Sequence, residues 1–310
     1  MGTPQFAVNS LEMLIEKGHQ VVAVVTQPDK PQGRGKKLAP PPIKAKALEF
    51  NLTVYQPQRI KEPGFIEILK NLQPEVIVVV AFGQILPQEI LELPPLGCIN
   101  VHASLLPKYR GAAPIHWAII NGEEETGVTT MLMDEGLDTG PMLLKESIRI
   151  NETMTMGHLH DQLAQLGANL LVETLDKLSR GQLKPEAQND ALSSYAPLLT
   201  KEHEKINWQD RKDDIHNLVR GMNPWPGAYT LFKGARLKIW ETTLEKYPGG
   251  EQGKAGEILK VTQGGLWVQA GDHPLLITKV QPAGKKLMPA VSFANGYGII
   301  PGQYLGEENE

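Results

Sequence analysis

The 310-residue sequence has few cysteines and no long apolar stretch, and each absence excludes a class of protein. Cys98 is its only cysteine, which excludes a disulfide framework and a cysteine-based metal cluster and favours a reducing cytoplasm. No run reaches the ~18–20 apolar residues of a membrane helix, and the N-terminus lacks a signal-peptide pattern, so we expect no membrane partner. Apolar residues make up 41%, which is typical of a globular chain, and the length suffices for two domains.

An excess of basic charge is also lacking. Lys and Arg number 31 against 35 Asp and Glu, a net charge of −4, which by itself does not favour a nucleic-acid partner. The charge is unevenly distributed, however. Residues 1–200 hold 17 basic and 22 acidic side chains, whereas residues 201–310 hold 14 and 13. A local basic run, from Asp29 to Lys46, contains six basic residues and one acid.

Several standard motifs are missing. The stretch GRGKKL at 33–38 begins like a dinucleotide fingerprint but lacks its third glycine. The sequence contains no phosphate-binding P-loop, zinc-protease helix or nucleophile elbow. For His158 and His160 we expect surface or packing roles rather than metal ligation.

The first half alternates between β-branched runs and helical periodicity. The expected strands are residues 21–26, 75–82, 98–102 and 127–133, and the expected helices are residues 6–17, 43–50, 64–72, 112–121 and 155–180. Continuous Val and Ile runs indicate strands that are buried on both faces. The alternation predicts an α/β fold with a doubly wound, Rossmann-like parallel sheet.

The second half has a different pattern. Residues 183–200 lose their period and include Pro185 and Pro197, which predicts a linker. A helix is expected near 211–221, followed by short strands at 235–243, 256–261, 265–270 and 274–281. Such short strands predict a small, OB-like β-barrel. We therefore expect a catalytic domain over 1–183, a linker over 184–202 and a barrel over 203–310.

Polar residues follow two of the expected strands. In an open α/β sheet, ligands bind beyond the carboxyl ends of the strands. Asn100 and His102 stand two apart at such an end, so their side chains point to one side of the chain. Strand 127–133 is followed by Asp134, Glu135 and Asp138, which a parallel arrangement places at the same edge. An Asn–His pair alone is more often structural, but the added Asp makes this edge a candidate catalytic site.

The surrounding motifs carry a resemblance. The motifs are NVHASLLPKYRGAAPIHWAI and ETGVTTMLMDEGLDTGPML, and they are supported by GTPQFAV, TQPDKPQGRGKKL and VRGMNPWPGAYT. Through these motifs the sequence resembles the formyltransferase family that uses 10-formyltetrahydrofolate, over essentially the whole chain. The resemblance implies direct attack of an amine on the formyl group through a tetrahedral intermediate, without a metal or covalent enzyme intermediate. It also implies a catalytic trio of Asn100, His102 and Asp138. Asn100 and protonated His102 would donate to the formyl oxygen, and Asp138 would hold His102 and help to move the proton.

The resemblance further implies contacts with the folate and with the acceptor. Folate contacts are expected from the loops after 75–82 and 133 and from the 104–107 turn: Phe82, Gly83, Ile85, Leu86, Ser104, Leu105, Leu106, Pro107, Asp134 and Gly136. The sequence is most similar to members that formylate initiator methionyl-tRNA for translation initiation. Expected tRNA contacts are Arg34, Lys36 and Lys37 in the basic loop and Lys233, Arg236 and Lys238 in the barrel. We expect a monomer.

One departure and several alternatives stay open. Family members open with a short apolar strand before the GTP motif, whereas this chain begins Met1-Gly2-Thr3-Pro4, so we expect apolar residues upstream of Met1. Other folate formyltransferases act on a purine precursor or an amino sugar nucleotide. A hydrolase that releases formate from the folate could share the trio. The chain could also be a catalytically inactive tRNA-binding module.

Overall fold

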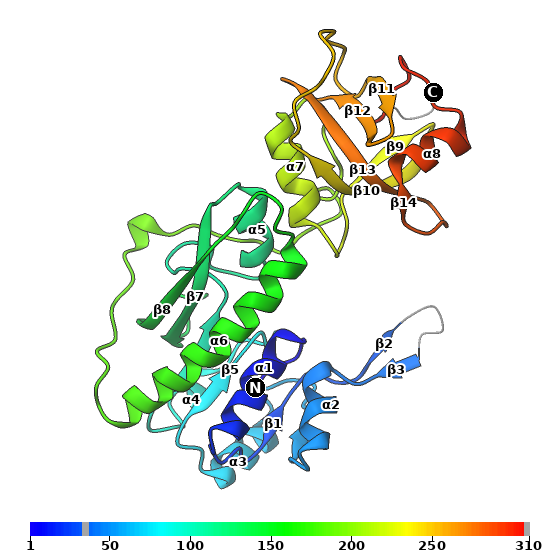
Figure 1. The fold of residues 1–310 in the computed structure, drawn as a ribbon. Coiled ribbons are helices and arrows are strands. Elements are labelled where there is room, and N and C mark those ends of the chain that lie inside the picture. Colours follow the sequence, from blue (N-terminus) through cyan, green and yellow to red (C-terminus); the bar gives the residue numbers. More distant parts are fainter. Residues whose placement is uncertain (33–36, 307–310) are drawn as a thin grey trace. The chain divides into compact units, whose positions relative to one another are not determined.

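The structure is a computed structural model that describes residues 1–32 and 37–306. The chain divides into two compact units (Figure 1). The first unit comprises Met1–Pro114, Glu125–Arg149 and His160–Ala196. The second comprises Ile115–Glu124, Ile150–Leu159 and Pro197–Glu310. The second unit therefore includes two short segments from the first half of the sequence.

The first unit combines helices with two sheets and a hairpin. Its helices are α1 (Phe6–Glu16), α2 (Pro42–Glu49), α3 (Pro63–Leu72), α4 (Gln88–Leu91) and most of α6 (Met156–Ser179). β1 (Val24–Val25) pairs with β4 (Val54–Tyr55), and β2 (Lys30–Gln32) pairs with β3 (Lys37–Ala39). The largest sheet has the order β5 (Ile77–Val79), β6 (Cys98–His102), β7 (Glu125–Leu132) and β8 (Met142–Arg149). Most helices begin and end within two residues of the predicted bounds.

The strand directions correct one prediction. The pairs β1–β4 and β5–β6 are parallel as expected, but β6–β7 and β7–β8 are antiparallel. The end of β7 therefore lies beside the start of β6, where Leu132 pairs with Ile99. The prediction failed because a continuous apolar run indicates burial on both faces and carries no information on direction. Strand β8 was not predicted.

Helix α6 covers one face of this sheet (Figure 1). It lies close to β6 at Gly167, where a Cβ atom would lie 2.9 Å from Val101 Cγ1. The hydroxyls of Thr174 on α6 and Thr130 on β7 lie 2.8 Å apart. Because side chains alternate along a strand, Val101 faces α6 while Asn100 and His102 face the opposite side. The helix thus leaves one face of β6 for the candidate site.

The first residues of the chain lie between the two parallel strand pairs. Gly2 N donates to Val25 O at 3.0 Å, and the Met1 amine donates to Val78 O at 2.6 Å. Behind Met1 lies a cavity of about 400 Å³, lined by residues from α1, by 19–25 and by 72–78. Burial lowers the pKa of the Met1 amine to about 5. The interior of this unit therefore has room for further apolar side chains.

The second unit is built on an antiparallel sheet. Its strands run in the order β11 (Ile258–Thr262), β12 (Gly265–Gln269), β13 (Pro274–Pro282), β10 (Ala235–Thr243) and β9 (Tyr229–Phe232), with β14 (Met288–Pro289) on β13. Helices α7 (Lys212–Gly221) and α8 (Ala290–Tyr297) pack against it, and the rings of Phe232 and Phe293 meet 5.5 Å apart. The predicted strands are confirmed, α8 was not predicted, and closure of the sheet into a barrel stays a prediction.

Two buried side chains of α7 hold an early segment onto the second unit. His216 contacts the Thr242 hydroxyl at 2.8 Å and Glu152 O at 3.0 Å. Arg220 donates to the carbonyls of Asn151 and Met154. Burial lowers the pKa of His216, because the charged imidazolium loses its hydration there. None of the helices in residues 1–32 and 37–306 combines the length and the apolar character that a membrane-spanning helix needs.

Candidate active site

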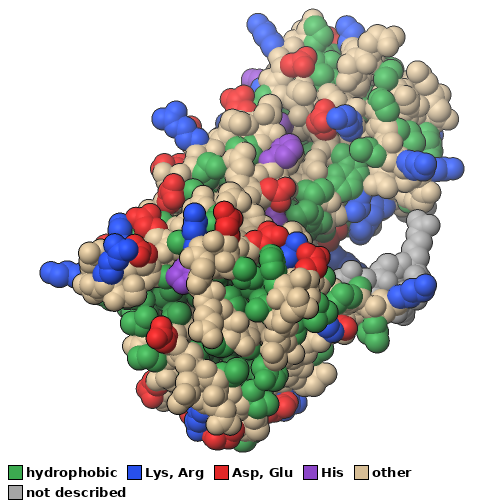
Figure 2. Space-filling model, turned by 60° about the horizontal axis from the view of Figure 1, so that its bottom comes forward, with side chains coloured by type: hydrophobic (Ala, Val, Ile, Leu, Met, Phe, Trp, Pro, Cys, Tyr) green, Lys and Arg blue, Asp and Glu red, His purple; other side chains and the backbone are tan. Residues whose placement is uncertain are grey.

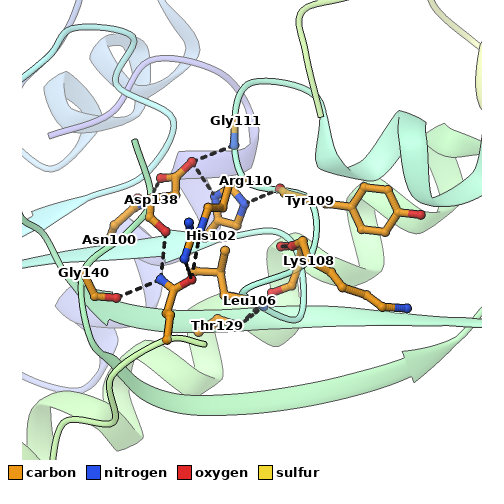
Figure 3. A network of polar contacts seen from close by, with 12 residues as sticks. Asn100, His102, Leu106, Lys108, Tyr109, Arg110, Gly111, Thr129, Asp138 and Gly140 are labelled. Atoms are coloured by element: carbon orange, nitrogen blue, oxygen red, sulfur yellow. Dashed lines mark hydrogen bonds and ion pairs between the residues drawn. The ribbon is translucent and has the colours of Figure 1, made fainter. Parts of the chain in front are cut away.

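Three of the predicted site residues meet on the open face of β6. Asn100 Nδ2 donates to Asp138 Oδ1 at 3.3 Å, and His102 Nδ1 lies 3.7 Å from Asp138 Oδ2 (Figure 3). Asn100 is 9% exposed and His102 is 6% exposed. The prediction that Asn100 and His102 share one side is confirmed. Asp138 reaches them for another reason than the one predicted: the 133–141 loop folds back over β6 from the far end of β7.

The imidazole of His102 has a defined orientation. Its Nε2 lies 2.9 Å from the carbonyl oxygen of Tyr109, an atom that can only accept a hydrogen bond. Nε2 therefore carries the proton, and Nδ1, the atom facing Asp138, is the one that can gain or lose one.

The loops around the trio are held in uncommon backbone conformations. Asp138 has φ +53° and Tyr109 has φ +60°, in the left-handed region that side chains other than glycine rarely adopt. Such residues cost about 1–3 kcal/mol each and persist only where neighbouring contacts enforce them. Here Gly111 N donates to Asp138 Oδ2 at 2.8 Å, and Tyr109 N donates to the Ser194 hydroxyl at 2.9 Å. The site is therefore preorganised by its surroundings.

The 104–107 turn, predicted to contact folate, is tightly bonded to the sheet. The Ser104 hydroxyl donates to Lys108 O at 2.6 Å, and the Thr129 hydroxyl donates to Ser104 O at 2.7 Å. Leu106 N donates in turn to the Thr129 hydroxyl, and the Leu106 side chain is 1% exposed. Ser104 and Leu106 therefore shape the turn, while Leu105 and Pro107 keep part of their surface exposed.

The other predicted folate residues fall into two groups. Phe82 and Leu86 are buried in a cluster with Ile60 and Phe65, so only their backbone atoms could contact a ligand. Exposed positions in the same loops are Gly83, Ile85, Asp134 and Gly136. Ile85 is 85% exposed, which is unusual for an isoleucine and consistent with a ligand contact.

A segment that was predicted to be only a linker also builds the site. Arg110, 2% exposed, donates from Nε and Nη2 to Gln188 Oε1 and from Nη2 to Asp190. Gln188 Nε2 donates to the carbonyls of Asp138 and Gly140, both at 2.8 Å. Gln188 lies 50 residues after Asp138, in a stretch without periodicity. No sequence pattern marks it, because only the tertiary fold brings these segments together.

The predicted tRNA contacts in the first unit are only partly described. Arg34 and Lys36 lie outside the described residues, and Lys37 is exposed on β3. On the face in Figure 2, basic and acidic side chains are interspersed. This face therefore presents no broad field of one sign.

The predicted cations of the second unit share one hairpin. Arg236 and Lys238 stand two apart on β10, on the side opposite buried Leu237. Lys233 lies at the β9–β10 turn, 5.2 Å from the Phe232 ring centre. The Arg236 guanidinium stacks 3.8 Å from the Tyr229 ring centre and lies 3.7 Å from Glu204, while Lys238 Nζ donates to Pro226 O at 2.6 Å. Arg236 is thus partly neutralised, whereas Lys233 is exposed at the turn.

Other candidate chemistry has a structural explanation. The Cys98 thiol donates to Ile90 O at 3.4 Å, and burial raises its pKa to about 12, so the group stays protonated at neutral pH. The His160 ring packs edge-on against Phe6. Within residues 1–32 and 37–306, no group of three or more His, Cys, Asp or Glu side chains is arranged to hold a metal ion.

Comparisons with known proteins place this geometry in context. The family described as "Formyl transferase" matches residues 1–175, and "Formyl transferase, C-terminal domain" matches residues 198–298. A methionyl-tRNA formyltransferase of Pelobacter propionicus is 55% identical over 99% of this chain and 95% of its own length. A methionyl-tRNA formyltransferase of Desulforamulus reducens is 54% identical over 99% of this chain and 97% of its own length. The fold is shared with the sugar 3N-formyl transferase WlaRD, whose structure was solved with dTDP and 5-N-formyl-THF. The two structures superpose with a TM-score of 0.66 and 21% sequence identity, over 92% of this chain and 97% of that one.

Proposed function

Because the chain belongs to the methionyl-tRNA formyltransferases within the formyltransferase family, we propose that it transfers the formyl group of 10-formyltetrahydrofolate to the free amino group of initiator methionyl-tRNA. The reaction takes place in the cytoplasm, where it prepares the initiator for translation. The observation that carries the proposal is that Asp138, from the 133–141 loop, meets buried Asn100 and His102 on the face of β6 that α6 leaves free.

The donor set fits a formyl group. When bound, the folate supplies the formyl carbon that the amine attacks directly and the nitrogen that departs. Asn100 offers an amide N–H, and His102 offers Nδ1–H when protonated, because its Nε2 is already bound to Tyr109 O. Two fixed donors suit the oxygen on which negative charge develops, and each such donor contributes about 2.7–4 kcal/mol in comparable sites.

Asp138 positions the two donors and assists proton transfer. Its Oδ2 lies 3.7 Å from His102 Nδ1 and helps to place the imidazole, while Oδ1 accepts from one N–H of Asn100 and keeps the amide in position. As the amine attacks, it must lose one proton, and the departing folate nitrogen must gain one. Asp138 is the only carboxylate that contacts both partners of the trio among the described residues, so it assists this transfer.

Folate and tRNA contacts divide between the units. The folate contacts side chains or surface that is exposed at five positions: Ile85, Leu105, Pro107, Asp134 and Gly136. Five others contact it through backbone atoms or fix the shape of the loops: Phe82, Gly83, Leu86, Ser104 and Leu106. Arg34 approaches the acceptor end of the tRNA, and Lys233, Arg236 and Lys238 contact its phosphates. A catalytic domain over 1–183 and a tRNA-binding, OB-like barrel over 203–310, in a monomer, are consistent with this division.

The decisive experiment is formylation of charged initiator tRNA by the purified chain with 10-formyltetrahydrofolate, with a methionine-charged elongator tRNA as control. Formylated initiator tRNA, with elongator tRNA formylated much more slowly, is expected. Free formate without formylated tRNA would identify a hydrolase, and product only from an amino sugar nucleotide would identify a sugar formyltransferase. Binding of tRNA without any turnover would identify an inactive binding module.

A separate variant tests the basic loop. Arg34→Ala is expected to lower the rate of formylation more than tRNA affinity, because a loop at the acceptor end positions the reacting amine, where small displacements are costly. The measurement is single-turnover formylation at saturating tRNA, with Lys61→Ala on the exposed surface as a control. An unchanged rate at saturation would remove Arg34 from the acceptor site.

A further inference from the structure

The position of Asp138 depends on a side chain from outside the trio. Asp138 lies in the 133–141 loop with φ +53°, in the left-handed region that Asp adopts more readily than most residues other than glycine. Two hydrogen bonds hold this loop by its carbonyls: Gln188 Nε2 donates to Asp138 O and to Gly140 O, each at 2.8 Å. Any group that orients the backbone of Asp138 also orients its carboxylate toward His102.

The orientation of the Gln188 amide is unambiguous. Its Oε1 accepts from Arg110 Nε at 3.0 Å and from Nη2 at 2.8 Å, and a guanidinium can only donate. Its Nε2 faces two carbonyl oxygens, which can only accept. Both donors and both lone pairs are thus used. A glutamate at this position could not donate, and a lysine or arginine could not accept.

Arg110 is anchored independently of this amide. Its guanidinium also donates to Asp190 at 2.8 Å, and its backbone pairs with 194–196, where Arg110 N donates to Ser194 O and Ala196 N donates to Arg110 O. Arg110 is 2% exposed, so its charge requires these acceptors. The next residue, Gly111, donates its N–H to Asp138 Oδ2 at 2.8 Å. The 107–111 loop and Gln188 therefore hold Asp138 from two sides.

We propose that Gln188 is a positioning residue of the formyl transfer: it couples buried Arg110 to the Asp138 loop and thereby sets the carboxylate against His102. The inference rests on the proposed role of Asp138 and adds a residue from the 184–202 segment, which was predicted to be a linker. Gln188 does not touch the reacting groups. Its effect on turnover passes through the geometry of Asp138.

The sharpest variant is Gln188→Glu, which keeps size and the acceptor for Arg110 but replaces the donor by a second oxygen facing two carbonyls. We expect kcat to fall about 10- to 100-fold at saturating substrates, on the scale of a small displacement of a catalytic group. KM for tRNA is expected to change less than about threefold. Gln182→Glu, an exposed glutamine close to the same segment, is the matched control and is expected to have normal kcat and KM.

A double-mutant cycle with Asp138→Asn separates positioning from general damage. If Gln188 acts through Asp138, then Gln188→Glu has little further effect on kcat once Asp138 is replaced. Its pH profile of kcat/KM should also differ from the parent's, which a merely structural role would not produce. Normal kcat in folded Gln188→Glu, or effects of the two changes that simply multiply, would overturn the inference.

Two further outcomes keep the tests distinct. If Asp138→Asn itself turns over normally, the proposed catalytic trio fails, whereas a slow Asp138→Asn with a normal Gln188→Glu refutes only the positioning role. If Gln188→Glu does not fold, as shown by its thermal midpoint, Gln188→Asn provides the test. It carries the same groups on a shorter stem that cannot span both partners, and normal kcat in that variant would also refute the role.

Discussion

The polar groups around Asp138 and the cations of the β9–β10 hairpin are functional candidates of two different kinds. Around Asp138 the side chains of Asn100, His102 and Arg110 are buried, and Asp138 and Gln188 are held by hydrogen bonds with defined partners. On the hairpin, Lys233, Arg236 and Lys238 lie at the surface over aromatic rings. Buried groups that share partners act as a unit, whereas exposed charges act almost independently and are screened by salt.

The largest expected effect is the loss of turnover when one member of the catalytic trio is removed. Asn100→Ala, His102→Ala and Asp138→Ala should each lower turnover by about 10²–10³-fold, the scale of losing one donor to a developing oxyanion. Circular dichroism and thermal unfolding should show that each variant remains folded. The measurement is the rate of formylation of initiator tRNA under single-turnover conditions. Near-normal rates in all three would reject the mechanism.

The next effect concerns the apolar interior of the first unit, where a change should alter the free energy of unfolding but not turnover. Adding a few Val and Ile residues before Met1 should fill the cavity of about 400 Å³ and remove the buried amine. Each side chain that becomes buried should add about 1.5–3 kcal/mol to the free energy of unfolding. Urea denaturation measures the gain, and a Gly/Ser extension of equal length is the control. Turnover well below the unfolding temperature should not change, since the trio lies elsewhere.

Smaller and additive effects are expected on the hairpin. Replacing the three cations by Gln should weaken tRNA binding and reduce the slope of log affinity against log salt by about 0.7–0.9 for each phosphate that is no longer neutralised. Arg236 should contribute least, because Glu204 already lies 3.7 Å from its guanidinium. Folate binding should be unchanged. The control is the removal of three exposed cations of the first unit: Lys17, Lys61 and Arg180. An unchanged slope in the hairpin variant would assign these residues to ordinary solvated surface.

The smallest effect concerns stability in the second unit. Burial holds the pKa of His216 below its unfolded value of about 6.5, and Arg220 lowers it further, against Asp213 and Glu152, which raise it. As pH falls below about 6.5, His216 becomes protonated in the unfolded chain but stays neutral in the folded protein. The free energy of unfolding should therefore decrease by up to about 1.4 kcal/mol per pH unit.

The test compares variants over pH. Urea denaturation between pH 5 and 7.5 should show a weaker pH dependence for His216→Asn than for the parent. His158→Asn, at an exposed histidine, is the matched control and should retain the parent's pH dependence. Equal slopes for all three proteins would show that His216 does not contribute.

Most elements of the fold could be predicted because their signals are local. The helical period of 155–180 and the β-branched run 98–102 correspond to α6 and β6 almost residue for residue. Strand direction could not be predicted, because the apolar runs at 98–102 and 127–133 look the same in either orientation. Likewise, Asn100 and His102 were placed on one side by strand alternation, which needs only their spacing of two.

Local patterns were sufficient to predict the α/β character, the placement of Asn100 and His102 on one side of a strand and the family resemblance, since these depend on neighbouring residues or on long local matches. The return of the 133–141 loop over β6 and the link from Arg110 through Gln188 to Asp138 arise only in the folded chain. The physical reason is that buried donors and acceptors must find partners wherever the folded chain brings them. For Asp138 that partner lies 50 residues away, in a segment with no periodicity to reveal it.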